Sequence, residues 1–199
     1  MSNLTLALGR PTLADRIVSR NLVADILLIA AGTALTELSA QIIVPLQPVP
    51  FTMQTFAVLL VGTAMGPMRG AISMALYMVL GLVGLPVFAG LSSGNALLLP
   101  TGGYLVGFVL AAALVGWLAQ VEWDRKFLKA IVTFTAGSVV IYAVGAPWLA
   151  ASLGISLTDA IGVGVVPFLV GDALKALLAA GLLPLAWFGV SKLRSKSDS

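Results

Sequence analysis

Long apolar stretches alternate along the chain with short segments that hold most of its charges, prolines and turn-forming glycines. A charged side chain at the centre of a bilayer costs about 2.5 kcal/mol or more, so charges mark where apolar stretches leave the membrane. The pattern predicts six membrane-spanning helices, at about residues 22–44, 51–65, 70–85, 103–120, 130–149 and 165–190. The chain is therefore expected to be an all-α membrane protein, a six-helix transmembrane bundle forming one integral domain over residues 1–199.

Helix-breaking residues set the ends of these predicted spans. Prolines at 45, 48 and 50 close the first span, because proline lacks an N–H and restricts the residue before it. The segment 66–70 is predicted as a tight turn after the second span, and prolines and glycines place a loop at about 86–102. A segment rich in Gly, Ser, Thr and Asp, residues 152–164, is predicted as the last loop.

The basic residues all lie on one side of this arrangement, apart from one lysine inside a span. Three arginines precede the first span, Arg69 separates the second from the third, residues 125–129 hold three more cations, and the tail after residue 191 holds the last three. The opposite loops, 45–50, 86–102 and 150–164, contain no Lys or Arg. By the positive-inside rule, both termini are expected in the cytoplasm of a cell whose plasma (inner) membrane holds the chain.

The composition removes whole classes of function. Apolar residues make up 59% of the chain and charged residues 10%, whereas a soluble domain has roughly 45–50% and 25%. The net charge of +3 is not gathered on a polybasic face, so no nucleic-acid partner is expected. The chain has no Cys and no His, which excludes disulfides, thiolate nucleophiles and histidine bases. No P-loop sequence is present, and we expect neither enzymatic activity nor a bound metal or cofactor.

The sixth predicted span carries two charges. Lys175 is the only basic residue inside a span, and Asp172 lies three residues before it, on the same helical face. Ionisable residues within membranes usually face a cavity and act on a ligand, an ion or a proton. In one interpretation the two residues neutralise each other and fix the helix. In the other they form a ligand site, where Lys175 binds a carboxylate and Asp172 accepts hydrogen bonds from N–H donors.

Further polar and aromatic residues lie at the outer ends of spans. Gln54 either forms a hydrogen bond between helices or contacts a ligand, and Tyr104 and Trp148 either form an interfacial belt or line a site. Glu37 lies inside the first span with no basic neighbour in the sequence. A proton carried by Glu37 or Asp172 would make the chain a stand-alone, proton-coupled secondary transporter of a small carboxylate-bearing solute, which is the alternative function.

Small residues recur at a spacing of four, which lets helix backbones approach closely. The pairs lie at 30 and 34, 62 and 66, 103 and 107, and 176 and 180. Most of these pairs are expected to pack the bundle internally, and one face could instead bind a second membrane protein.

Several segments together resemble one family. They read IVP at 43–45 with PVPFTMQT at 48–55, GPMRG at 66–70, GLPVFAG at 84–90, PTGGY at 100–104, and PF at 167–168 followed by GDALK at 171–175. They occur in order along the chain from the first predicted span to the sixth, and the ordered set is similar to the BioY family of biotin transporters. Members of that family are the substrate-capture subunits of energy-coupling-factor (ECF) transporters.

The resemblance implies a ligand whose chemistry suits these residues. Biotin carries a carboxylate at the end of an apolar valeryl chain, and its ureido group offers two N–H donors and a C=O acceptor. On this reading, Lys175 pairs with the carboxylate and Asp172 accepts from a ureido N–H. Gln54 and a polar group of the 91–95 loop satisfy the remaining groups.

The 91–95 loop departs from the family's usual Gly-rich pattern, so Ser92 and Asn95 remain alternatives for its ligand-facing residue. The resemblance further implies apolar walls with Tyr104 or Trp148, since vitamin sites are mostly apolar with a few convergent polar groups.

The resemblance also implies partners. The family's substrate-capture subunit assembles with a transmembrane (T) component and two ATPase subunits, which agrees with the absence of a P-loop from this chain. The small residues Ala30 and Ala34 in the first span are the expected contact with the partner membrane subunit.

Overall fold

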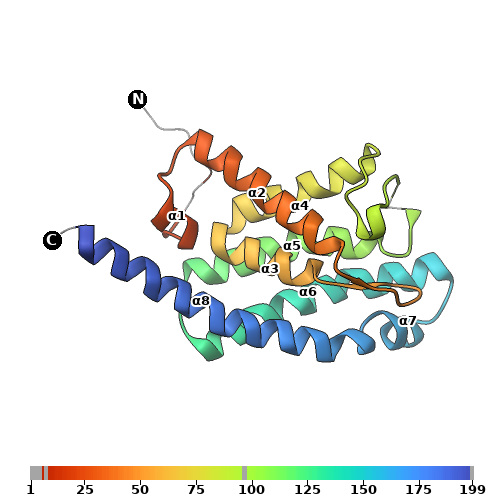
Figure 1. The fold of residues 1–199 in the computed structure, drawn as a ribbon. Coiled ribbons are helices and arrows are strands. Elements are labelled where there is room, and N and C mark those ends of the chain that lie inside the picture. Colours follow the sequence, from red (N-terminus) through yellow and green to blue (C-terminus); the bar gives the residue numbers. More distant parts are fainter. Residues whose placement is uncertain (1–5, 7–8, 96–97, 198–199) are drawn as a thin grey trace.

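The computed structural model describes residue 6, residues 9–95 and residues 98–197, which form a bundle of helices (Figure 1). The helices are α1 (Leu13–Ile17), α2 (Leu22–Ala40), α3 (Gln54–Met65), α4 (Pro67–Leu82), α5 (Gly102–Gln120), α6 (Phe127–Leu153), α7 (Leu157–Gly164) and α8 (Leu169–Ser197). Two 3-10 turns, η1 (Ala89–Leu91) and η3 (Val166–Phe168), and a hairpin of β1 (Ile43–Val44) and β2 (Phe51–Thr52) complete the described elements.

Four helical stretches are long and apolar enough to cross a membrane. They are α2, α5, α6 and the run from Leu157 to Lys192, which contains α7, η3 and most of α8. The two apolar helices between them are shorter, with 12 residues in α3 and 16 in α4. At 1.5 Å per residue these helices span about 18 and 24 Å, less than the roughly 30 Å of a bilayer core.

In the structure, helix α2 ends earlier than the predicted first span, and helix α3 begins later than the predicted second span. The first was expected to reach residue 44, but α2 ends at Ala40, and the second was expected from residue 51, but α3 begins at Gln54. The prolines between them hold the chain extended, and its backbone groups pair across the hairpin, with Ile43 opposite Thr52 and Val44 opposite Phe51. Extended segments at the end of a span thus satisfy their backbone polar groups without a helix.

The last predicted loop is wrong in part, because residues 157–164 of it form α7. Ser156 begins this helix by accepting a hydrogen bond from the Asp159 N–H at 3.1 Å, as N-cap serines do. The chain then makes the 3-10 turn η3 at Pro167, so α8 begins at Leu169 rather than at residue 165 and continues to Ser197. The predicted third, fourth and fifth spans are confirmed as helices, although α4 starts earlier than predicted and α6 is longer at both ends.

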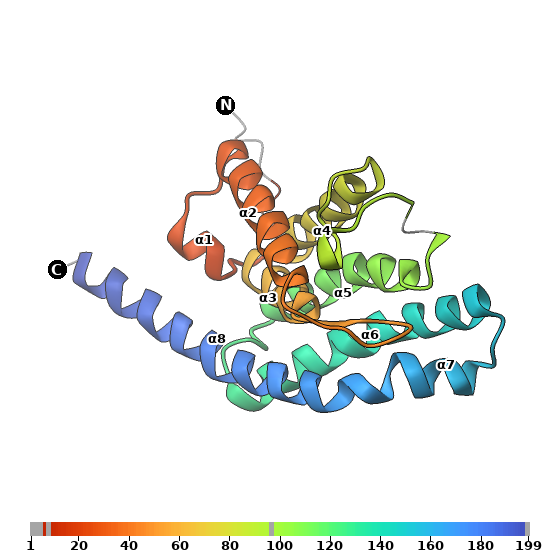
Figure 2. The ribbon, with the colours of Figure 1, turned by 45° about the vertical axis from the view of Figure 1, so that its right-hand side comes forward.

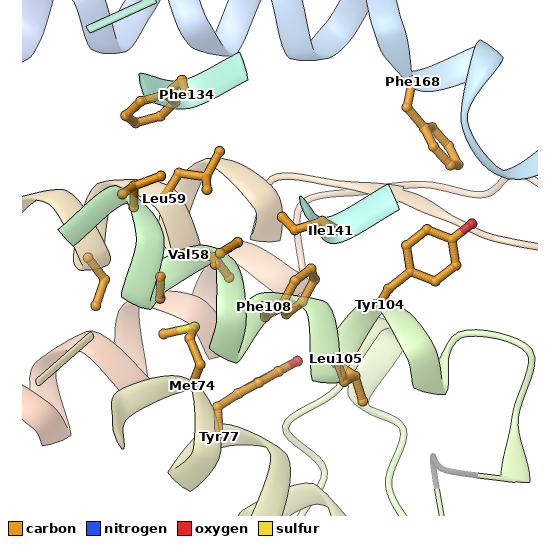
Figure 3. Close-up of a cluster of buried hydrophobic side chains, with 14 of the residues drawn as sticks. Val58, Leu59, Met74, Tyr77, Tyr104, Leu105, Phe108, Phe134, Ile141 and Phe168 are labelled. Atoms are coloured by element: carbon orange, nitrogen blue, oxygen red, sulfur yellow. The ribbon is translucent and has the colours of Figure 1, made fainter. Parts of the chain in front are cut away.

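The core is made where α3, α4, α5 and α6 meet, and Figure 3 shows side chains such as Val58, Met74, Phe108 and Ile141 pointing into it. Glycines from two of the predicted packing pairs let the backbones of these helices approach closely. A Cβ on Gly62 would lie 2.5 Å from the Ala112 carbonyl oxygen. A Cβ on Gly107 would lie 3.0 Å from Ile141. The prediction of internal packing is confirmed for these pairs and for Ala176 and Ala180, which are buried.

A buried ionic network joins α1 to α2 and α4. Arg69, which lies in the predicted turn 66–70, is 1% exposed, and aspartates of α1 and α2 pair with it. Its Nη1 lies 2.7 Å from Asp15 Oδ1, and its Nε donates to Asp25 Oδ1 at 2.7 Å. Burial raises the pKa of Asp15, but hydrogen bonds from Arg20, the Thr12 N–H and Arg69 outweigh it and hold this pKa below the ordinary 3.8.

The bundle has two distinct ends, which Figures 1 and 2 show from two directions. At one end, here called the basic end, lie both ends of the chain, α1 and the α3–α4 and α5–α6 turns. At the other, here called the loop end, lie the β1–β2 hairpin, residues 83–95 and 98–101, and the α6–α7 turn. Helix α8 lies along α6 and extends past the other helices at the basic end.

Candidate functional site

A cavity of about 210 Å³ lies between the helices near the loop end. Its walls come from the hairpin, the start of α3, the segment 88–101, and helices α5, α6 and α8. The lining residues are Val49, Pro50, Phe51, Thr52, Gln54, Thr55, Phe88, Ala89, Ser92, Leu99, Thr101, Tyr104, Leu105, Phe108, Tyr142, Phe168, Asp172 and Lys175. Most of them are apolar or aromatic, and the polar ones are few, as in sites for small organic ligands.

Lys175 reaches this cavity with every donor of its ammonium group occupied. Its Nζ donates to the Thr52 carbonyl at 2.9 Å, to Thr55 Oγ1 at 2.7 Å and to Asp172 Oδ1 at 3.2 Å. The ammonium also lies 4.1 Å from the centroid of the Phe51 ring, a favourable cation–π position. The residue is 5% exposed, so the protein holds a fully partnered cation at an apolar wall.

The carboxylate of Asp172 is held by residues of three helices. Its Oδ2 accepts a hydrogen bond from the Tyr142 hydroxyl, and its Oδ1 takes the contact from Lys175 together with Thr55 Oγ1 at 3.5 Å. Charged groups removed from water are tolerated when they are paired and hydrogen-bonded. The predicted pairing of Lys175 with Asp172 is therefore present, and a tyrosine from α6 and a threonine from α3 complete it.

An aromatic wall adjoins the charged pair. The Phe51 and Phe168 rings stack with centroids 5.9 Å apart, and Phe168 stacks on Tyr142 at 6.4 Å. Tyr104 meets Tyr142 edge to face, also at 6.4 Å. Gly171 sits against Phe51, since a Cβ there would lie 2.2 Å from the ring. The wall therefore comes from the hairpin, α5, α6 and η3 together.

Gln54 lines the cavity and also joins α3 to α4. Its Nε2 donates to the Tyr77 hydroxyl at 2.6 Å, and Tyr77 in turn donates to the Val87 carbonyl at 3.1 Å. Its Oε1 accepts from Thr52 Oγ1 at 2.9 Å. The interhelical hydrogen bond predicted as one alternative is present, and it links the start of α3 to the segment that carries Phe88 and Ser92.

The two loop candidates occupy different places. Ser92 lines the cavity, with its hydroxyl donating to the Ala89 carbonyl at 2.9 Å. Asn95 is exposed and is not among the lining residues that the structure describes. Gln41 of α2's C-terminal end holds this loop, since its Oε1 accepts from the Leu91 N–H at 3.0 Å and its Nε2 donates to the Phe88 carbonyl at 3.1 Å.

The two aromatic candidates at span ends also differ in their position relative to the cavity. Tyr104 lines the cavity and is buried, and its hydroxyl donates to the Gly164 carbonyl at 2.9 Å, which ties α5 to α7. Trp148 is not among the described lining residues. Its Nε1 donates to the Leu99 carbonyl at 3.1 Å, and its Cβ lies 2.3 Å from where a Cβ on Gly103 would be. Trp148 therefore supports the cavity wall from outside.

Three residues that the sequence analysis singled out, all on α2, lie away from the cavity. Ala30 and Ala34 are exposed on one face of α2, beside the exposed Leu27 and Leu38. Glu37 is half-buried on the same helix and is not among the described lining residues.

Sequence reasoning missed Tyr142 and Thr55. One signal was available for Tyr142, because a phenolic hydroxyl in an apolar span needs a hydrogen-bond partner. Thr55 directly follows Gln54, so a site at the start of α3 brings both into reach. Neither partnership is visible as a spacing, since Tyr142 lies 30 residues from Asp172 and Thr55 lies 120 residues from Lys175.

The arrangement offers a donor and an acceptor side by side. Lys175 Nζ and Asp172 Oδ1 are 3.2 Å apart, so a ligand group that meets one of them also lies near the other. A carbonyl with an adjacent N–H fits this pair, because its oxygen can replace one of the three present acceptors of the ammonium while its N–H donates to the carboxylate. A ligand carboxylate fits less well, since it would approach the like charge of Asp172.

Comparison with known proteins identifies the chain's relatives. The sequence model of the BioY family matches residues 10–192. The protein named "Biotin transporter BioY" of Thermotoga maritima is 42% identical over 169 residues, which cover 83% of this chain and 88% of that protein. A Pyrococcus horikoshii protein named "Probable biotin transporter BioY" is 41% identical over 156 residues, covering 78% and 91%.

A solved structure shares the fold as well as the sequence similarity. It is described as the S-component for biotin from an ECF-type ABC transporter. It is 28% identical, with a TM-score of 0.71, and the match covers 87% of this chain and 92% of that one. The family match over nearly the whole chain, the relatives and the shared fold agree with one another: this chain belongs to the BioY family.

Proposed function

We propose that this chain captures biotin in the cavity at the loop end of the bundle. As a member of the BioY family, it is a multi-pass membrane protein, and it serves biotin transport as the S-component of an ECF-type ABC transporter. It is a transport subunit and not an enzyme. The observation that carries the site assignment is the buried Lys175–Asp172 pair, held by Thr55 and Tyr142 at an aromatic wall.

The pair binds one end of biotin, which revises the expectation that Lys175 and Asp172 each bind a different end. The carboxylate and the ureido group stand at opposite ends of the valeryl chain, whereas Nζ and Oδ1 are 3.2 Å apart. The ureido end satisfies both: its C=O takes the place of one of the three present acceptors of the Lys175 ammonium, and a neighbouring N–H donates to Asp172. The aromatic wall of Phe51, Phe168 and Tyr142 then covers the fused rings.

The carboxylate points toward Ser92 and Thr101. Ser92 is an exposed residue of the described lining, and this side is here called the mouth of the cavity. A charge in this position keeps part of its hydration, so its burial costs less than it would beside Lys175 and Asp172. Gln54, which shares the lining, offers a further amide to the ligand. Tyr104 lies beside Tyr142 and closes the apolar wall.

Isothermal titration of the purified chain with biotin tests the assignment. The variant Asp172→Asn keeps the shape of the side chain but replaces the charged acceptor, so binding should weaken by about tenfold or more, because a hydrogen bond to a charged group contributes about 1.5–3 kcal/mol. Asp159→Asn changes an exposed aspartate of α7 outside the cavity and is the matched control. Unchanged binding by Asp172→Asn would remove the pair from the site.

We further propose that six spans cross the plasma membrane with both termini in the cytoplasm. The one-sided placement of the basic residues supports this orientation, which puts the cavity mouth outside. A cysteine introduced at Ser92 should react with an impermeant thiol reagent in intact cells without biotin. A cysteine at Ser197 should react only after permeabilisation, and the opposite pattern would invert the topology.

The proposed partners are the transmembrane (T) component and the ATPase subunits of an ECF transporter, with α2 as the contact. The exposed small residues Ala30 and Ala34 support this, because they leave α2 open to the close approach of another helix. Replacing both with Trp should break the complex and leave biotin binding intact. Uptake that persists without an ATPase partner and stops with a protonophore would instead favour the proton-coupled alternative with Asp172 or Glu37.

A further inference from the structure

A second cavity lies at the basic end, far along the bundle from the biotin site. It has a volume of about 310 Å³ and is lined by Arg16 of α1, Arg125 of the α5–α6 turn, and Trp187, Val190 and Ser191 of α8. The elements that form it meet directly, since α1 contacts α8. Two arginines from segments 109 positions apart in the sequence thus face one space.

The positive charge of this cavity is only partly neutralised. Arg16 forms no hydrogen bond or ion pair with any residue in the described part of the chain, and its Nε is buried. The Nε of Arg125 is likewise buried without a described partner, and its Nη1 pairs with Glu122 at 3.0 Å. A buried N–H without an acceptor costs about 1–3 kcal/mol, so an anionic ligand that reorients these guanidinium groups and accepts from them would remove this cost.

The indole of Trp187 shapes the cavity. The Arg125 guanidinium stacks over its ring at 4.2 Å, and its Nε1 donates to Asp124 Oδ2 at 2.6 Å. Asp124 is buried and is not among the described lining residues. The indole is therefore fixed by a carboxylate behind it and holds Arg125 in place at the cavity.

An apolar surface continues from the cavity along α8. Leu185 is 67% exposed and Phe188 is 66% exposed, one turn or less from Trp187. In a membrane this surface meets lipid acyl chains, and tryptophan favours the level of the headgroups. The cavity thus places two cations at the level of the lipid headgroups, next to a helix surface that faces the acyl chains.

We propose that this cavity binds the phosphate of an anionic phospholipid through Arg16 and Arg125, with an acyl chain along Leu185 and Phe188. Arginine suits this ligand, because its planar fork pairs with phosphate oxygens through two parallel hydrogen bonds. Basic pockets between helices at the cytoplasmic side of membrane proteins bind such headgroups. The bound lipid holds α1 against α8 and the α5–α6 turn, independently of biotin.

Native mass spectrometry of the purified full chain, titrated with phosphatidylglycerol, tests the proposal. The wild type should retain one tight phosphatidylglycerol, and phosphatidylcholine should bind more weakly. Arg16→Gln and Arg125→Gln should each weaken phosphatidylglycerol binding by about fivefold, since one basic residue near an anionic lipid contributes about 1 kcal/mol. Lys126→Gln removes one exposed cation beside Arg125 outside the cavity and should bind as the wild type does.

A blocking variant and a soluble anion complete the test. Ser191→Trp keeps both arginines and fills the cavity, so it should lose the tight lipid. Biotin binding by each variant reports that it is folded, because the two sites lie at opposite ends. Equal loss in all three charge variants would show a diffuse surface effect and overturn the proposal, as would unchanged binding in the two arginine variants. Displacement of the lipid by millimolar inorganic phosphate would assign the cavity to a free anion instead.

Discussion

The assignment of the ureido end to the charged pair predicts how biotin and its analogues respond to Lys175→Met. Methionine keeps the length and apolar stem of the lysine but removes all three donors, which contact Thr52, Thr55 and Asp172. Truncating one partner of a buried, hydrogen-bonded charge pair costs about 2–5 kcal/mol. Biotin should therefore bind roughly thirty- to several-thousand-fold more weakly.

Analogues altered at each end identify which end Lys175 meets. Biotinamide lacks the carboxylate charge, and we expect Lys175→Met to weaken biotin and biotinamide equally, because the lost contact lies at the ureido oxygen. In 2-iminobiotin an N–H group replaces that oxygen, so the ammonium faces a donor instead of an acceptor. Removing Lys175 should then leave 2-iminobiotin binding unchanged or tighter.

Isothermal titration of all three ligands against the wild type and Lys175→Met gives the full comparison. Lys126→Met, an exposed lysine outside the cavity, is the control for loss of charge, and thermal unfolding without ligand shows whether the variant is folded. A large loss for biotin with little loss for biotinamide would refute the reasoning and place the carboxylate on Lys175. An equal loss for all three ligands would mean that the lysine only supports the helix.

The hydrogen bonds and ion pairs around Asp172, Arg69 and Asp15 give three further predictions. Tyr142→Phe removes the hydroxyl that donates to Asp172 and should weaken biotin binding by about tenfold or more, measured by titration, and unchanged affinity would show that the hydroxyl is dispensable. Arg69→Met removes the cation that Asp15 and Asp25 share, while Arg20 still pairs with Asp15, so it should destabilise the fold by about 3–5 kcal/mol, seen as a lower midpoint of thermal unfolding. The lowered pKa of Asp15 makes its contribution to stability complete above about pH 4 and lost as pH falls through its folded value; Asp15→Asn should be less stable than the wild type at neutral pH, and the difference should shrink in acid.

The sequence alone determined the features that depend on local composition. Apolar runs of span length predict helices in any membrane protein, because each span must satisfy its own backbone hydrogen bonds. The Lys175–Asp172 pair was predicted because residues three apart on a helix always share a face. The family followed from short segments in order along the chain, and the comparisons confirmed it.

Helix ends and short elements were less well predicted, since they depend on contacts outside the segment. The hairpin of β1 and β2 forms because Ile43 and Val44 find partners after a proline-rich turn. Helix α7 has only eight residues, two of them glycine, so its sequence could not be distinguished from a loop. Packing of Ala160 and Gly164 against the bundle stabilises that helix, and no isolated helix of this length is stable in water.

Only the tertiary structure decided which distant residues meet. It brought Thr55 and Tyr142 to the charged pair, placed Ser92 rather than Asn95 along the cavity wall, and buried Arg69 between Asp15 and Asp25. Such contacts join helices that are far apart in sequence, and their register is set by close approaches such as Gly62 against Ala112. The sequence specifies each helix through its own residues, whereas the contacts of Thr55 and Tyr142 with the Lys175–Asp172 pair emerge only when the helices pack.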